Sequence, residues 1–215
     1  MDSDVLVVAR PDRLPRIECR GGIAARTTLA DTVHLISAAA TPLGGDTIAI
    51  RVIVEAGARL SLRSAAATIA LPSADTPISH ACVDLEVAGY LDVDLEPTVV
   101  AGGAAHWSTV AATIDGAGTL RLRERVQIGR SDERTGFWSG SLHVDAKGQP
   151  LLRHRVEVGS GAVADDVLSA PRACISELRY PAEEVAAPPG GVLLYLAAGG
   201  VLMTWQGERL VAAPR

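Results

Sequence analysis

Apolar and polar residues alternate along most of the chain with the period of a β-strand. In one stretch the apolar positions are Ile48, Ile50, Val52 and Val54, and in a second, from 120 to 128, arginines occupy positions between apolar residues. Such alternation predicts strands with one buried and one solvated face. Helical periodicity is weak before residue 160, so the pattern predicts a mainly β protein.

One local pattern returns four times. It consists of an apolar residue, an acid, a turn of small residues that includes glycine, and a second run of alternating apolar positions. The copies begin at Val54, Leu85, Ile114 and Val144, so their starts lie roughly thirty residues apart. Each copy predicts a β-turn between two strands. A regular period of this length indicates stacked β-coils.

The pattern changes after residue 160. Two short helices are predicted, from Ala162 to Leu168 and from Ala173 to Leu178, each stopped by a following proline. The expected fold is therefore mainly β: an extended, helix-like or solenoid-like stack of antiparallel strands with a small helical portion near the C-terminus.

The length predicts a single domain. A chain of 215 residues with 48% hydrophobic content can bury one sizeable core. The β-coils are expected over about 41–160, and a helical and β section over 161–215.

Composition and motifs exclude several classes of function. The formal net charge of -5 provides no basic field for a nucleic-acid backbone. Lys147 is the only lysine and does not belong to a G-x-x-x-x-G-K-[ST] phosphate loop. Neither a G-x-S-x-G elbow nor a pair of histidines at metal-ligand spacing is present. The histidines are therefore interpreted as ordinary surface or packing residues.

The cysteines and apolar runs predict a cytoplasmic location. Cys19, Cys82 and Cys174 are widely separated, which favours reduced thiols over a disulfide framework. The first residues do not resemble a secretory signal, and the longest apolar run, Val192 to Met203, is too short to span a bilayer. No membrane partner is expected.

Carboxylates at several positions are candidates for a functional role. Asp92, Asp94 and Glu96 alternate with apolar residues, so a strand would present all three on one face. Without further context, a solvated strand face is the favoured explanation for them. Glu124 lies on the apolar side of its strand, where an unpaired charge is costly to bury. Either an arginine pairs with it or it lines an internal polar space.

Asp46 follows two glycines, Gly44 and Gly45, and precedes a strand. Aspartate at this position is typical of a turn, where its side chain accepts backbone hydrogen bonds. The same residue could instead be a carboxylate that is positioned for binding. The local sequence leaves both interpretations open.

Four segments match, in order, motifs of one known family. They are Thr41 to Asp46 followed by Ala56 to Leu60 (G-G-D…G-A-x-L), Leu91 to Val99 (L-E…P-T-I), Glu124 with Ile128 to Arg130 (E-x-x-x-L-G-R), and Pro150 to Arg153 in the strand that follows. The matches extend from about residue 20 to 160. Together they resemble the urease accessory proteins called UreD or UreH.

The resemblance implies a non-enzymatic chaperone. Members of that family form a complex with UreF and the GTPase UreG, dock on apo-urease and support GTP-dependent delivery of nickel to its active site. No tightly bound cofactor is implied, only nickel(II) in transit. Homodimerisation within the complex is compatible with this assembly.

The resemblance also implies a set of site residues. Asp46, Asp92 and Glu124 match acidic positions of the family and would line a transient internal route for nickel. The supporting positions are Thr98, Gly44, Gly45 and Arg130. Glu96 is a further supporting candidate, but the family more often has an amide or an apolar residue there, so the resemblance does not imply its role. Two alternatives stay open: a β-solenoid module that binds another protein without nickel, and a hydrolase with a site made of scattered acids.

Overall fold

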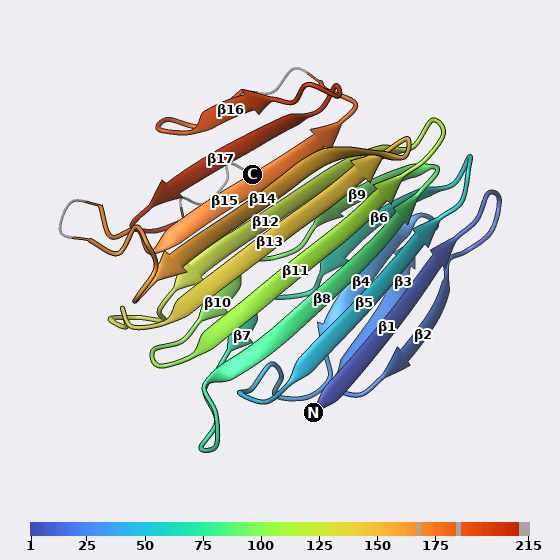
Figure 1. Ribbon diagram of the computed structural model, residues 1–215. Coiled ribbons are helices and arrows are strands. Elements are labelled where there is room, and N and C mark those ends of the chain that lie inside the picture. The colour runs from blue at the N-terminus through green and yellow to red at the C-terminus, as the bar shows by residue number, and fades with distance from the viewer. Residues whose placement is uncertain (167–168, 184–185, 211–215) are drawn as a thin grey trace.

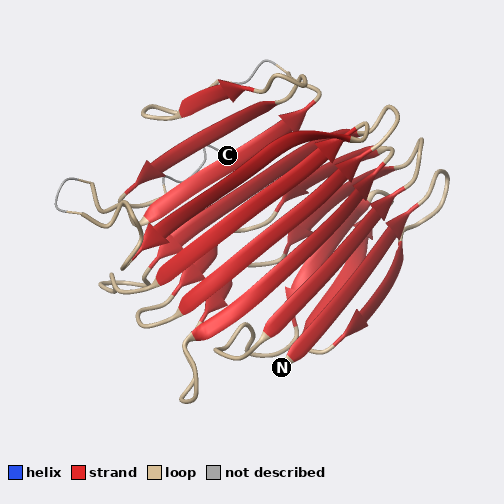
Figure 2. Ribbon diagram, viewed as in Figure 1, coloured by secondary structure: helices blue, strands red, loops and turns tan. Residues whose placement is uncertain are grey.

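The computed structural model describes residues 1–166, 169–183 and 186–210. These residues form strands, turns and loops without any helix, and the strands build two facing sheets (Figures 1 and 2). Sheet A contains β1 (Asp2–Ala9), β2 (Arg16–Arg20), β5 (Thr47–Val54), β8 (Ile78–Val87), β11 (Ala105–Ile114), β13 (Phe137–Ala146) and β14 (Gln149–Gly159). Their order in the sheet is β14-β13-β11-β8-β5-β1-β2.

Sheet B faces sheet A and is larger. It contains β3 (Ile23–Leu29), β4 (Thr32–Ser37), β6 (Arg59–Ser64), β7 (Thr68–Ala70), β9 (Tyr90–Asp94), β10 (Thr98–Val100), β12 (Thr119–Ile128), β15 (Ala173–Tyr180), β16 (Val192–Tyr195) and β17 (Val201–Gly207). The main order is β16-β17-β15-β12-β9-β6-β4-β3, and β10 pairs with both β7 and β12.

The chain winds between the sheets as a β-solenoid of about four turns. Strands β5, β8, β11 and β13 are parallel in sheet A, and β4, β6, β9 and β12 are parallel in sheet B. The expectation of an antiparallel stack is therefore wrong for the body of the molecule. Successive coils wind in the same sense, so equivalent strands run in the same direction. Antiparallel pairs, such as β1 with β2 and β13 with β14, lie near the two ends.

The predicted turns stack on one another. Those after Val54, Val87 and Ile114 connect sheet A to sheet B, as expected for coils. A Cβ atom on Gly89 would lie 2.3 Å from the Ala58 carbonyl oxygen of the preceding turn, so glycine permits this close stacking. The fourth turn, at Lys147 and Gly148, instead closes a hairpin between β13 and β14 within sheet A. The parallel stack of sheet A ends there.

The prediction of helices after residue 160 is wrong for the described residues. Residues 173–180 form β15, which pairs with β12 so that Leu178 lies opposite Leu122. Residues 162–166 form turns and bends, and Val167 and Leu168 lie outside the described residues. The helix preference of so short a segment is weak. Pairing with β12 and burial of most of the strand therefore outweigh it.

The core lies between the sheets and consists of two apolar clusters. The larger cluster lies beside the turns that lead from sheet A to sheet B, where Leu60, Leu91 and Leu120 occupy equivalent positions of successive coils. The smaller cluster lies towards the opposite ends of the strands and contains Ala70, Val100, Ala104, Val126, Ile128, Trp138, Val158 and Cys174.

Candidate functional site

Between the two apolar clusters lies a layer of polar and small side chains. On each of three strands, one such residue separates a member of the larger cluster from a member of the smaller one. These residues are Glu124 between Leu122 and Val126, Ser176 between Leu178 and Cys174, and Gly140 between Leu142 and Trp138. The core is thus interrupted at the same level on β12, β15 and β13.

Neighbouring strands continue this layer. Ala81 and Ser108 align with Gly140 across sheet A, and Thr204 aligns with Ser176 in sheet B. The Ser108 hydroxyl of sheet A donates a hydrogen bond of 3.0 Å to the Glu124 carboxylate of sheet B, so the layer extends across the interior. We call these residues, Ala81, Ser108, Glu124, Gly140, Ser176 and Thr204, the polar seam.

Two cavities adjoin the polar seam. The first, of about 270 Å³, is lined by Ala81, Ser108 and Glu124 together with apolar residues of the larger cluster. The second, of about 770 Å³, is lined by Ser176 and Thr204 together with residues of β14 and β16. Glu124 and Ser176 are directly opposite each other in register, so the seam lies where the two cavities approach each other.

Glu124 is the only ionisable residue of the polar seam. Within residues 1–166, 169–183 and 186–210 no arginine or lysine forms an ion pair with it. Of the two alternatives left open by the sequence, Glu124 therefore lines an internal polar space. Burial raises the pKa of the Glu124 carboxyl, and the hydrogen bond from Ser108 opposes this shift in part.

His106 also lines the first cavity, although no motif or spacing in the sequence singled it out. Its ring Nδ1 lies 2.9 Å from the Ser79 hydroxyl, and both side chains are buried. Burial and the nearby His80 lower the pKa of His106 to about 4, so its ring is neutral at neutral pH. The available signal was its place on the inward side of β11, in alternation with Ser108 and Val110.

Asp46 lies in the loop before β5 and is also buried. Its carboxylate accepts hydrogen bonds from the Thr41 hydroxyl at 2.8 Å and the Leu43 backbone N–H at 2.9 Å, and it contacts the Met1 amino group. Burial opposes ionisation, but these hydrogen bonds outweigh it and lower the pKa of Asp46. Asp46 does not line either cavity that adjoins the polar seam.

The glycines before Asp46 permit this loop. A Cβ atom on Gly44 would lie 1.7 Å from the Thr76 carbonyl oxygen. Gly45 has a φ of 89°, in the left-handed region that favours glycine. Both glycines therefore permit the backbone conformation of the loop that holds the Asp46 carboxylate in place.

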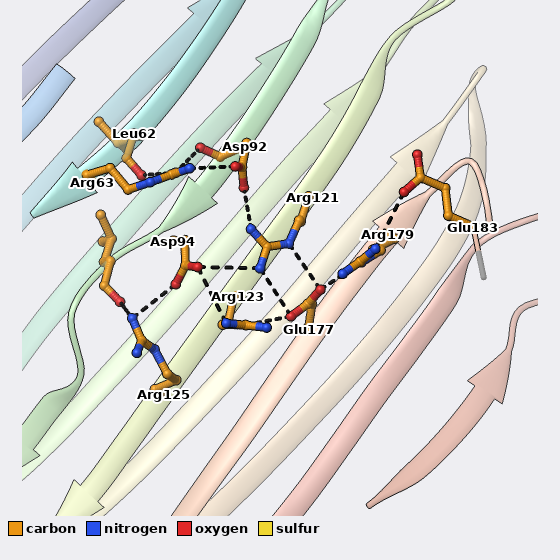
Figure 3. Close-up of polar contacts among 11 residues, drawn as sticks. Leu62, Arg63, Asp92, Asp94, Arg121, Arg123, Arg125, Glu177, Arg179 and Glu183 are labelled. Carbon is orange, nitrogen blue, oxygen red and sulfur yellow. Dashed lines mark hydrogen bonds and ion pairs between the residues drawn. The ribbon is translucent and has the colours of Figure 1, made fainter. Parts of the chain in front are cut away.

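Asp92 belongs to a network of ion pairs on the outer face of sheet B (Figure 3). Its carboxylate lies between Arg63, at 2.5 Å, and Arg121, at 2.9 Å. Each arginine is 29 residues from Asp92, which is close to the period of one coil. The repeat length was therefore the signal that could have identified both partners from the sequence.

The network continues across β12 and β15. Glu177 is buried and accepts hydrogen bonds from Arg121 at 3.1 Å, Arg123 at 2.5 Å and Arg179 at 2.7 Å. Burial would raise the pKa of Glu177, but the arginines outweigh it and lower the pKa to about 2. Neither Glu177 nor these arginines were identified as a cluster from the sequence, because their contacts join different coils.

The other candidate positions are divided between three places. Asp94 lies on the outer face of sheet B, where it contacts Arg125 at 3.0 Å. Glu96 follows the end of β9, and both it and Thr98 line the first cavity. Arg130 is exposed in the loop after β12 and pairs with Glu133, away from the polar seam. The structure thus brings Glu124, Glu96 and Thr98 to one cavity and leaves Asp46, Asp92 and Arg130 outside it.

Comparison with known proteins identifies the family. A sequence model of the UreD urease accessory protein family matches residues 23–194. The chain belongs to this family. It is 37% identical over 203 residues to urease accessory protein UreD 1 of Saccharopolyspora erythraea, which covers 91% of this chain and 80% of the relative.

Two further UreD relatives are longer than this chain. The UreD protein of Frankia alni is 41% identical over 154 residues, covering 68% of this chain and 52% of the relative. The UreD protein of Frankia casuarinae is 34% identical over 206 residues, covering 86% and 65%. The chain therefore spans about half to two thirds of these two relatives.

UreD proteins take part in urease maturation and are not catalytic. The family is involved in nickel insertion into urease. In the described part of this chain, no group of three or more histidine, cysteine, aspartate or glutamate side chains could hold a metal ion. None of the described residues forms a helix that could span a membrane.

Proposed function

We propose that this chain is a scaffold for metal delivery that acts with UreF and the GTPase UreG on apo-urease, and that nickel(II) passes along its polar seam. The observation that carries the proposal is the position of Glu124. It is the carboxylate of the polar seam, it is flanked by apolar residues on its own strand, and together with Glu96 it lines a cavity of about 270 Å³. Family membership supports the partners.

The donors of the polar seam suit transit better than storage. Nickel(II) binds nitrogen and sulfur ligands tightly, so several imidazoles or thiolates would retain it. The seam offers one carboxylate and the hydroxyl groups of Ser108, Ser176 and Thr204. Burial raises the pKa of the Cys174 thiol, with a contribution from Glu124, so this neighbour stays a protonated and weak ligand.

Charge balance gives Glu124 its role. A divalent ion inside an apolar core needs a compensating charge, and Glu124 is the acid that the seam supplies. Because burial favours its protonated form, an arriving cation would displace a proton and a departing one would allow the proton to return. The ion is then attracted into the seam without being held by a complete ligand set.

Asp46 and Asp92 remain predicted members of the route, and their contacts define what such a role requires. Asp92 would have to release Arg63 or Arg121 before it could bind a cation. Asp46 would have to give up hydrogen bonds that fix its loop. Glu124 has no such competitor among its contacts, so we place the main oxygen donor there.

The partners and the compartment follow from the same family assignment. This chain has no phosphate loop, so GTP hydrolysis has to be supplied by another protein such as UreG. The cysteines Cys19, Cys82 and Cys174 are free thiols, which supports assembly in the cytoplasm.

Urease activation tests the proposal. Apo-urease is activated at limiting nickel by UreF, UreG and either the wild-type chain or Glu124→Ala. We expect the variant to co-purify with UreF as wild type does but to lower urease activity and its nickel content. Asp84→Ala is the matched control, because Asp84 is an exposed carboxylate on the outer face of β8. Full activation by Glu124→Ala would disprove the nickel route, and loss of UreF binding would assign Glu124 a structural role.

A further inference from the structure

The outer face of sheet B carries an excess of positive charge, although the chain as a whole is acidic. Seven arginines and three carboxylates lie on this face, in alternation with residues that face the core. They are Arg26, Arg59, Arg63, Arg121, Arg123, Arg125 and Arg179, and Asp92, Asp94 and Glu177. The chain has 20 basic and 25 acidic residues, so all other positions together hold 13 and 22. The formal charge is therefore +4 on this face and -9 on the rest of the chain.

The outer face of sheet A does not share this excess. Its strands place five arginines and seven carboxylates there, which are Arg16, Arg20, Arg51, Arg153 and Arg155, and Asp2, Asp4, Glu18, Asp84, Glu86, Asp145 and Glu157. The two sheet faces therefore differ in the sign of their net charge. A negatively charged partner is attracted to sheet B and not to sheet A.

Ion pairs within the outer face of sheet B leave its arginines nearer to the solvent than its carboxylates (Figure 3). The side chains of Glu177, Asp92 and Asp94 are 1%, 13% and 19% exposed. Four of the five arginines that pair with them are more exposed, at 23–28%. An approaching molecule therefore meets guanidinium groups before it meets the acids beneath them.

Two further arginines of this face are not neutralised. Arg26 and Arg59 are both exposed. Arg26 donates a hydrogen bond of 2.8 Å to the Ala25 carbonyl oxygen, and the Arg59 guanidinium lies 4.2 Å from the centre of the Tyr90 ring. In residues 1–166, 169–183 and 186–210 neither arginine forms an ion pair. Both therefore have N–H groups available for a carboxylate of another molecule.

The register of sheet B joins these arginines to the network of ion pairs. Arg26 lies opposite His34, and His34 lies opposite Arg63. Arg59 lies opposite Tyr90, two residues from Asp92 on the same face of β9. The positive positions therefore extend from the edge strand β3 across β6 and β12 to β15.

We propose that the outer face of sheet B docks an acidic surface of another folded protein, with Arg26 and Arg59 pairing with its carboxylates. A guanidinium group can bind a carboxylate through two parallel hydrogen bonds, which gives geometric selectivity as well as attraction. The ion pairs within the face already hold several of its arginines in place, so less side-chain freedom is lost on binding. The face lies on the opposite side of sheet B from the polar seam, so the proposal does not depend on the nickel route.

A compact acidic surface fits this face better than a long polyanion does. A nucleic acid that extended beyond the face would meet the remainder of the chain, whose formal charge of -9 repels it. An acidic patch on a folded protein can instead match the area of the face and end at its margins. The opposite charges of the two surfaces also select against neutral and basic proteins.

Fluorescence anisotropy tests the chemistry of the face with the full chain. The carboxylate probe is a fluorescein-labelled deca-glutamate peptide, and the phosphate probe is a labelled single strand of ten thymidines. We expect the peptide to bind at about 50 mM salt and to be released towards about 1 M, because salt screens exposed charges. Arg26→Glu combined with Arg59→Glu should weaken peptide binding by at least about tenfold.

The matched control combines Arg13→Glu with Arg20→Glu. Both residues are exposed and lie outside sheet B, so this variant has the same net charge as the first. It should bind the peptide nearly as the wild type does. Circular dichroism reports whether both variants are folded, which we expect because none of the four arginines is in an ion pair among the described residues.

Co-purification identifies the partner, and this readout rests on the partners of the proposed function. We expect the Arg26 and Arg59 double variant to lose UreF, UreG or apo-urease in low salt, and the control to retain all three. Glu124→Ala should also retain them, so a failure of the nickel route and a failure of the docking face give different results.

Several results would overturn the proposal. One is a wild-type chain that does not bind the peptide in low salt, and another is equal weakening by the two double variants. Tighter binding of the thymidine strand than of the peptide would assign the face to nucleic acid instead. Retention of all three proteins by the folded Arg26 and Arg59 variant would show that the face docks none of them.

Discussion

Replacing Glu124 by glutamine should make the protein more stable. The substitution keeps the size of the side chain and an oxygen that can accept the hydrogen bond from Ser108. It removes the negative charge that burial disfavours at this position. We therefore expect the free energy of unfolding to rise, although nothing new contacts the residue.

The effect of Glu124→Gln on stability depends on pH. An acid with a raised pKa in the folded state does not destabilise the protein below its ordinary pKa of 4.5, because it is protonated in both states. As the pH rises, the wild type loses stability relative to Glu124→Gln until the folded pKa is passed. Removing a charge that burial disfavours should stabilise the protein by about 1 to 2 kcal/mol at pH 8, within the range that burial of a polar group costs in proteins.

Urea unfolding, monitored by tryptophan fluorescence, measures this difference between pH 4 and pH 8. The difference should be small at pH 4 and should grow as the pH rises. A Glu124→Gln variant that is less stable than wild type at pH 8, or a difference that does not change with pH, would refute the idea that Glu124 is retained at a cost to stability. Combined with lower urease activation, a gain in stability would indicate that the carboxylate is present for function.

Two further substitutions test the packing of the seam and the outer ion pairs. Gly140→Ala should destabilise the fold by about 1–3 kcal/mol, because the new Cβ would lie 2.0 Å from the Trp138 ring; an unchanged urea midpoint and fluorescence would contradict this. Glu177→Gln should cost about 1.5–3 kcal/mol at pH 7, because it removes the charge that strengthens the hydrogen bonds from Arg121 and Arg179. The pKa of Glu177 is about 2 in the folded state, so the stability that its ionised form contributes is lost as the pH falls from 4.5 towards 2. A difference in the free energy of unfolding between wild type and variant that stays constant over this range would contradict the role given to Glu177.

The sequence predicted the coils because their signals are local. Alternation of apolar residues and turns with glycine, such as those at Gly57 and Gly116, depend on neighbouring residues alone. The same signals do not specify strand direction, since a strand alternates in the same way whether its neighbour is parallel or antiparallel. The helix expected at 173–178 failed for a related reason: pairing with β12 is a contact between distant segments that a short local preference cannot anticipate.

For the candidate site, the sequence by itself placed Glu124 on the buried side of its strand, and the family motifs singled out its position. Only the tertiary structure decided that Ser108 rather than an arginine contacts it, that a cavity lies beside it, and that His106 shares this cavity. It likewise assigned Asp92 to arginines one coil away. The physical reason is that periodicity fixes which face of a strand is buried, whereas the partner on that face depends on how coils about thirty residues apart are aligned in register.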